Sequence, residues 1–125
     1  MPIEHFATDA IPQPVRGNFS HAVRAGDFVF LSGAAPFNPA TGEIPSDIDD
    51  QIRVTLSNLD AEARAAGASL AQAVRVGVYL RDMADFAALN RVYPAVMPHP
   101  LPARTTIQSD MEVRVEIDAV LYVGE

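Results

Sequence analysis

The hydrophobic period of this chain changes along its length, and this change restricts the possible folds more than any other feature. Between residues 46 and 66, apolar side chains recur at steps of three and four, which predicts an amphipathic α-helix. Ser46 is expected to cap its start and Gly67 to end it. The apolar positions of this predicted helix are Ile48, Ile52, Leu56, Leu59, Ala63 and Ala66.

Segments on both sides of this helix have the composition and period of β-strands. Residues 19–24 and 27–31 are separated by an Ala-Gly pair and predict a hairpin. Residues 74–80 alternate between valine or leucine and other residues, which predicts a strand with one buried face. Residues 104–108 and 113–123 are predicted to form the last two strands.

A second helix is predicted to begin at Asp82 and to kink or end at Pro94, since proline cannot donate its backbone N–H. The prolines of residues 98–102 should make the next connection stiff. Residues 1–17 contain further prolines and are expected to be an irregular or edge segment, so that regular structure begins near Phe19. The predicted order is ββαβαββ in a single domain of residues 1–125.

This order predicts an α+β fold with a mixed sheet and both helices packed on one face, because each helix has one apolar stripe to bury. The other sheet face is then uncovered. Some predicted strands carry apolar side chains on both faces. In one, Phe28 and Phe30 point to one face and Val29 to the other; in another, Tyr122 and Leu121 point to different faces. We therefore expect the uncovered face to contact other subunits of an oligomer.

Composition excludes several classes of function. The chain has no cysteine, which removes disulfides, thiolate metal sites and cysteine nucleophiles. Nine Lys and Arg against 16 Asp and Glu give a net charge of −7, without a basic cluster, so nucleic acid is not an expected partner. No segment is long and apolar enough for a membrane span, and no secretory leader is recognisable, so no membrane partner and a cytoplasmic location are expected.

No metal centre is predicted. His5, His21 and His99 lie far apart without ligand spacing. The acidic residues at 47–50 lack the glycine and terminal glutamate of a calcium loop, and favourable charges at a helix start explain them better.

Two charged residues in predicted strands are candidates for chemistry. Arg104 follows Pro102-Ala103 at the start of a strand, where a stiff approach can orient a guanidinium for bidentate binding of a carboxylate. Glu116 lies between Val115 and Ile117, where a carboxylate is disfavoured unless it faces a polar cleft or pairs with a cation. A simple ion pair between Arg104 and Glu116 at an interface is the alternative.

Taken together, motifs along nearly the whole chain resemble one family, the Rid (reactive intermediate deaminase) proteins, also called the YjgF or L-PSP endoribonuclease family. Each fragment is weak alone, but their order and spacing are specific. The matching fragments are Gly26-Asp27, Ser32-Gly33, Asn38-Pro39-Ala40-Thr41-Gly42-Glu43, Gln51, Asn58-Leu59, Ala66-Gly67-Ala68, Asp82-Met83-Ala84-Asp85-Phe86, Asn90, Tyr93, Pro102-Ala103-Arg104 and Val115-Glu116-Ile117-Asp118-Ala119.

The resemblance implies a fold similar to chorismate mutase and a homotrimer with three sites in the clefts between subunits. Family members with deaminase activity hydrolyse 2-imino or 2-enamino acids to 2-oxo acids and ammonia, without a metal or organic cofactor. By the same resemblance, Arg104 is expected to grip the carboxylate of a small anionic substrate, and Glu116 to position or activate water. The backbone carbonyl of Thr106 is a further candidate to hold that water.

The resemblance also assigns Ser32, Gly33 and Asn90 to the lining of the cleft. Two departures place the chain in a divergent subgroup. Phe19 stands where active deaminases commonly carry a tyrosine, which keeps the ring and removes the hydroxyl. The segment 105–115 is shorter than in the deaminase subgroup and has no Leu-Pro turn.

The leading hypothesis is therefore a hydrolytic deaminase of 2-imino or 2-enamino acids, or of a related imine. The alternative is a non-catalytic, small-molecule-binding or regulatory trimer that keeps an anion-binding cleft. A ribonuclease or translation inhibitor rests on the older family name alone, and the net charge of −7 argues against it. The natural substrate stays open, because a carboxylate anchor does not define the rest of the ligand.

Overall fold

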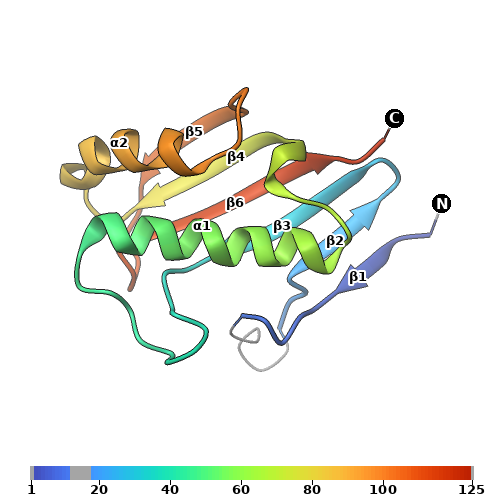
Figure 1. Ribbon diagram of the computed structural model, residues 1–125, viewed down its shortest axis with the longest axis horizontal. Helices are drawn as coiled ribbons and strands as arrows, with labels where there is room; N and C mark the ends of the chain where they lie inside the picture. The colour runs from blue at the N-terminus through green and yellow to red at the C-terminus, as the bar shows by residue number, and fades with distance from the viewer. Residues whose placement is uncertain (1, 12–17, 125) are drawn as a thin grey trace.

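Both helices lie on one face of a six-stranded mixed sheet (Figure 1). The structure is a computed structural model, and it describes residues 2–11 and 18–124. The helices are α1 (Ile48–Ala65) and α2 (Phe86–Val96). The strands, in sheet order, are β1 (Glu4–Phe6), β2 (Ala22–Ala25), β3 (Phe28–Ala34), β6 (Val115–Tyr122), β4 (Ala73–Leu80) and β5 (Ala103–Gln108).

The sheet is antiparallel except at one edge, where β4 and β5 are parallel. A parallel pair needs a crossover connection, and α2 supplies it between these two strands. The predicted hairpin is formed by β2 and β3, and the mixed sheet with both helices on one face is confirmed.

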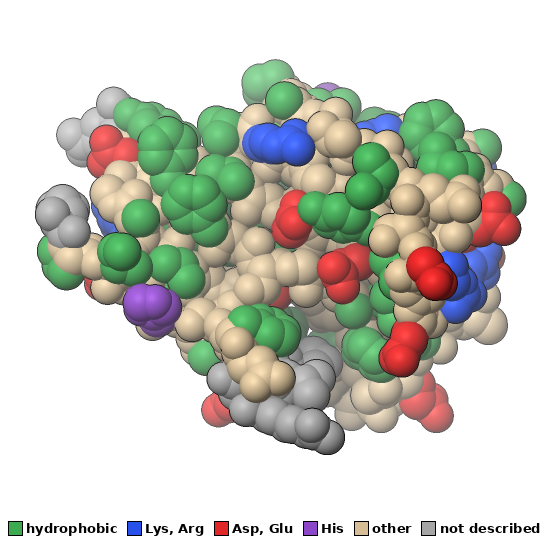
Figure 2. Space-filling model, turned by 180° about the vertical axis from the view of Figure 1, so that it is seen from behind, with side chains coloured by type: hydrophobic (Ala, Val, Ile, Leu, Met, Phe, Trp, Pro, Cys, Tyr) green, Lys and Arg blue, Asp and Glu red, His purple; other side chains and the backbone are tan. Residues whose placement is uncertain are grey.

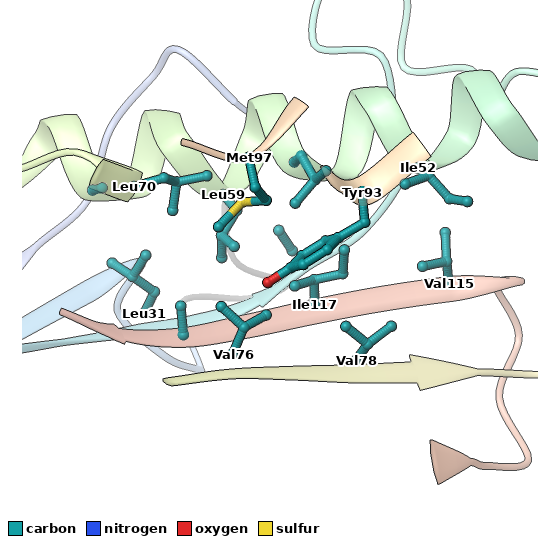
Figure 3. Close-up of a cluster of buried hydrophobic side chains, with 14 of the residues drawn as sticks. Leu31, Ile52, Leu59, Leu70, Val76, Val78, Tyr93, Met97, Val115 and Ile117 are labelled. Carbon is teal, nitrogen blue, oxygen red and sulfur yellow. The ribbon is translucent and has the colours of Figure 1, made fainter. Parts of the chain in front are cut away.

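The core lies between the helices and the sheet. Ile52 and Leu59 of α1 are fully buried and lie above Val76, Val78 and Ile117 of the sheet (Figure 3). Burying such side chains contributes about 1.5–3 kcal/mol each, which is the main reason why the helical stripe of α1 faces the sheet.

Two predictions near element starts were wrong. The start of the chain does supply an edge segment, but regular structure begins there, at β1, and not near Phe19, so the order is βββαβαββ. β1 pairs with β2 over three residues, a segment too short to show a hydrophobic period. The cap of α1 is Asp47 and not Ser46, since the Asp47 carboxylate accepts a hydrogen bond from the backbone N–H of Asp50 at 3.3 Å. Residues 12–17 of the expected irregular segment lie outside the described residues.

Two further segments differ from expectation. Val74 is exposed rather than buried with Val76, because the pairing of β4 with β6 shifts between Ala73 and Arg75. The second helix continues past Pro94 to Val96, after a 3-10 turn that Asp82 caps. Pro94 has no backbone N–H to donate to the carbonyl of Asn90, and the helix ends two residues later at Val96.

The sheet face opposite the helices carries exposed aromatic side chains. Phe28, Phe30 and Tyr122 are each 39–47% exposed, and the rings of Phe28 and Tyr122 meet edge to face at 5.5 Å. Figure 2 shows this face, with clusters of hydrophobic side chains around acidic groups near its middle. That other subunits cover the face stays a prediction. Neither helix in the described part of the chain is long and apolar enough to cross a membrane.

Candidate functional site

Arg104 lies on the helix-covered side of the sheet. In β5 it is the register partner of Val76, whose side chain points into the core, so both side chains leave the sheet on the same side. The Arg104 guanidinium donates a hydrogen bond to Asn90 Oδ1 at 2.7 Å, and its central carbon is 5.0 Å from the centroid of the Tyr93 ring. Such a cation–π contact and a hydrogen bond together hold the guanidinium in one orientation.

This position forms a shallow pocket at the edge of α2. Asn90 and Tyr93 of α2 line it, together with Leu101 and Pro102 of the proline-bounded connection. The sequence prediction of a stiff segment that presents Arg104 agrees with this geometry. Thr106, the partner of Val78 in the register, lies on the same side of the sheet, and its buried Oγ1 has no hydrogen-bond partner among the described residues.

Glu116 lies on the opposite side of the sheet. It is the partner of Tyr79 in the antiparallel pair of β4 and β6, and its neighbours Val115 and Ile117 point into the core. Burial, and in second place the negative charge of Asp118, raise the pKa of Glu116 above its ordinary value. A carboxylate with a raised pKa is a stronger base, which suits the expected role of accepting a proton from water.

Gly33 is needed beside this carboxyl group. A Cβ atom at position 33 would lie 2.6 Å from Glu116 Oε2, so any larger residue would displace the Glu116 side chain. The Ser32 hydroxyl donates to the backbone carbonyl of Ser20 at 2.5 Å. Ser32 therefore fixes the segment that carries Phe19 by joining it to the end of β3.

The sequence-predicted site residues fall into two groups on opposite sides of the sheet. Arg104, Asn90 and Thr106 lie on the side of the helices. Phe19, Gly33 and Glu116 line one pocket of about 210 Å³ near the end of β3. Within one chain the proposed anion-binding arginine and the proposed base therefore do not share a site.

The pocket beside Glu116 contains two α1 residues to which sequence reasoning gave no role. Asn58 and Glu62 are 3% and 2% exposed, and both line this pocket. Glu62 lies three residues after Leu59, so it falls on the apolar stripe of the helix. An acidic residue on an otherwise apolar stripe was the signal in the sequence that could have revealed it.

Glu62 is a buried acid, and none of the described residues forms a salt bridge with it. Its Oε1 has no hydrogen-bond partner among residues 2–11 and 18–124. Burial raises the pKa of Glu62 to about 9, and the negative charges of Asp118 and Glu116 add to the effect. The Glu62 carboxyl group is therefore neutral at physiological pH and can donate a hydrogen bond.

Metal-ligating side chains do not gather in the described part of the chain: no group of three His, Cys, Asp or Glu residues is arranged to hold a metal ion there. On the open sheet face, the face opposite the helices, Asp118 is engaged with a neighbouring side chain. The Tyr79 hydroxyl donates to Asp118 Oδ2 at 2.8 Å, and this hydrogen bond is the main reason why the pKa of Tyr79 is raised.

Comparisons with known proteins agree on one family. The family model described as Endoribonuclease L-PSP matches residues 9–123. A 2-iminobutanoate/2-iminopropanoate deaminase from Dermatophagoides farinae is 33% identical over 121 residues, which cover 94% of each chain. The crystal structure of RidA from an Antarctic Psychrobacter has a TM-score of 0.89 at 36% identity, covering 96% of this chain and 99% of that one. The structure of Escherichia coli TdcF with bound serine has a TM-score of 0.89 at 34% identity, covering 95% and 98%.

Proposed function

The chain belongs to the endoribonuclease L-PSP family, that of the Rid proteins, and from this premise we propose that it is a hydrolytic deaminase of 2-imino or 2-enamino acids. Its fold is the chorismate-mutase-like fold that the sequence resemblance implied. The observation that carries the proposal is the pair of half-sites. One presents an oriented guanidinium, and the other presents a carboxyl group with a raised pKa beside an open pocket.

We further propose that the complete site forms between two copies of the chain. Arg104 and Glu116 leave the sheet on opposite sides, so neither can reach the other within one chain. If the edge that carries Arg104 in one copy packs on the open sheet face of the next copy, the two half-sites come together. The exposed Phe28, Phe30 and Tyr122 supply apolar surface for that contact, and repetition around a threefold axis gives the expected homotrimer.

The proposed reaction needs only water as co-substrate. The Arg104 guanidinium binds the substrate carboxylate through two parallel hydrogen bonds and holds the imine carbon in place. Glu116 accepts a proton as the water oxygen bonds to the imine carbon and the C=N π bond opens, and it returns that proton to the nitrogen, which gives a carbinolamine. Glu116 then carries the proton of the new hydroxyl group to the amine nitrogen, the C–N bond breaks, and ammonia leaves as the 2-oxo group forms.

The test measures 2-oxo acid release from imines generated in situ. An amino-acid oxidase supplies the imines of several amino acids, and semicarbazide traps the imine that has not yet been hydrolysed. The wild type should lower semicarbazone formation from the imine, and Arg104→Ala should abolish the effect. The proposal fails if the wild type accelerates hydrolysis of none of these imines.

A second candidate function is binding without turnover, and Phe19 is the observation that favours it. Phe19 lines the pocket beside Glu116, and it cannot donate the hydrogen bond that a tyrosine would offer there. In this case calorimetry would show binding of 2-oxo acids by a protein that leaves imine hydrolysis unchanged. The same Arg104→Ala variant would then lose binding rather than catalysis.

A further inference from the structure

Two buried polar atoms without a partner lie in the pocket that Glu116 shares with α1. Asn58 Oδ1 and Glu62 Oε1 have no hydrogen-bond partner in the described part of the chain. The two residues are four positions apart in α1, which puts their side chains on the same face of the helix. A buried polar atom left unpaired destabilises the free protein, so a group that pairs with both atoms recovers this energy on binding.

The Asn58 amide is held in one orientation. Its Nδ2 donates to the backbone carbonyls of Ala35 and Phe37, at 2.9 and 2.8 Å. Because these two contacts use both amide hydrogens, Oδ1 is left as a fixed acceptor. A group that binds beside Asn58 therefore needs a hydrogen-bond donor to pair with Asn58 Oδ1.

Glu62 offers the opposite polarity. Its carboxyl group is neutral at physiological pH and thus carries an O–H that can donate a hydrogen bond. The described pocket lining includes no Lys or Arg that would hold Glu62 as a carboxylate; it includes one imidazole, His21, whose Nδ1 accepts a hydrogen bond from the backbone N–H of Thr8 at 3.0 Å. Together, Asn58 and Glu62 present one acceptor and one donor.

The rest of the pocket is mostly apolar and large enough for a small side chain. Ile11, Phe19 and Phe37 contribute large hydrophobic groups to its walls. Its volume of about 210 Å³ is several times the roughly 30 Å³ that one water molecule occupies in the liquid. Since Glu116 lines the same pocket, a substrate held at Glu116 can extend its side chain toward α1.

We propose that this pocket is the side-chain subsite of the substrate, and that it selects a side chain with an uncharged donor–acceptor group, a carboxamide or a hydroxyl. The carbonyl oxygen of a carboxamide accepts from Glu62, and its N–H donates to Asn58 Oδ1; a hydroxyl does both. An aliphatic side chain leaves both protein groups unpaired, and a carboxylate side chain adds a negative charge beside Glu116. This assignment rests on the proposed function, because it places the reacting carbon of the substrate at Glu116.

The test compares the binding of product 2-oxo acids that have the same shape and different polarity. Isothermal calorimetry measures Kd for 2-oxosuccinamate, 4-methyl-2-oxopentanoate and oxaloacetate, whose branched side chains end in an amide, two methyl groups and a carboxylate. Hydroxypyruvate and 2-oxobutanoate form a second pair, hydroxyl against methyl. The wild type should bind the amide and the hydroxyl compound at least about tenfold more tightly than their counterparts.

Two variants of Glu62 separate the hydrogen bond from the packing. Glu62→Gln keeps a donor of nearly the same shape and should keep the preference for the amide. Glu62→Leu removes the donor and should reduce the preference for the amide over the aliphatic compound to about threefold or less. Circular dichroism of each variant checks that the fold is unchanged, and a merely structural role of Glu62 would not make the two variants differ in this ratio.

The outcomes distinguish this inference from the proposed function. If the aliphatic 2-oxo acids bind but the amide shows no advantage, or if Glu62→Leu leaves the advantage intact, the subsite assignment is wrong and the deaminase proposal stands. If the wild type binds no 2-oxo acid at all and hydrolyses no imine, the proposed function is wrong and the subsite assignment falls with it.

Discussion

Replacing Glu62 by Gln should remove a large pH-dependent loss of stability. Burial raises the pKa of Glu62 from 4.5 to about 9 in the folded protein, so between these values the folded state binds a proton that the unfolded state has released. The stabilisation linked to this proton is complete below the unfolded pKa and is lost as pH rises toward 9. The free energy of unfolding therefore falls by up to about 1.4 kcal/mol for each pH unit in this window.

The Gln side chain has nearly the same shape and does not titrate, so the variant lacks this slope. Between about pH 5.5 and pH 7.5 the stability advantage of Glu62→Gln over the wild type should grow by roughly 3 kcal/mol. Urea unfolding followed by circular dichroism, at one fixed protein concentration, measures this difference at each pH.

The matched control is Glu43→Gln, which changes an exposed glutamate in the loop before α1. Its stability should follow that of the wild type at every pH. If the free energies of unfolding of Glu62→Gln and the wild type run parallel across this pH range, Glu62 is not a neutral buried acid. Glu62 then cannot be the hydrogen-bond donor of the proposed subsite.

Three further variants test other parts of the structure. Gly33→Ala should lower imine hydrolysis at least about tenfold with little change in oligomeric state, because a Cβ would lie 2.6 Å from Glu116 Oε2 and displace that carboxyl group. An unchanged kcat/KM would show that the position of the Glu116 carboxyl group does not matter for hydrolysis. Phe30→Asp puts a charge on the open sheet face and should give monomers in sedimentation velocity, whereas an intact oligomer would exclude this face as the interface. Arg114→Ala removes the 2.7 Å ion pair with the mostly buried Asp85 and should cost about 2 kcal/mol in urea unfolding, which a cost near zero would contradict.

The regular elements could be predicted where they are long enough to repeat a hydrophobic pattern. The apolar stripe of α1 extends over five turns, and the alternation of β6 extends over eight residues, so each pattern identifies a single type of secondary structure. The edge strand β1 has only three residues, and no period can be recognised in so short a segment. The cap at Asp47 was missed because Ser46 beside it is an equally good capping residue.

The candidate site was predictable as a set of residues and not as an arrangement. Arg104 and Glu116 were chosen by residue type and family resemblance, but their relative placement depends on the register of β5, β4 and β6. That register is set by contacts between segments far apart in the chain, which local patterns do not specify. Glu62 could have been noticed as an acid on an apolar stripe, but its high pKa follows from its surroundings in the folded protein.

The central claim is that a catalytic site forms between two copies of the chain, with Arg104 from one and Glu116 from the other. The most direct measurement mixes two inactive variants, Arg104→Ala and Glu116→Gln, by unfolding and refolding them together in equal amounts. In a randomly mixed trimer, about one site in four joins an intact Arg104 to an intact Glu116, so the mixture should recover about a quarter of the wild-type imine hydrolysis. Mixed oligomers that stay as inactive as the separate variants, while refolded wild type is active, would contradict the account.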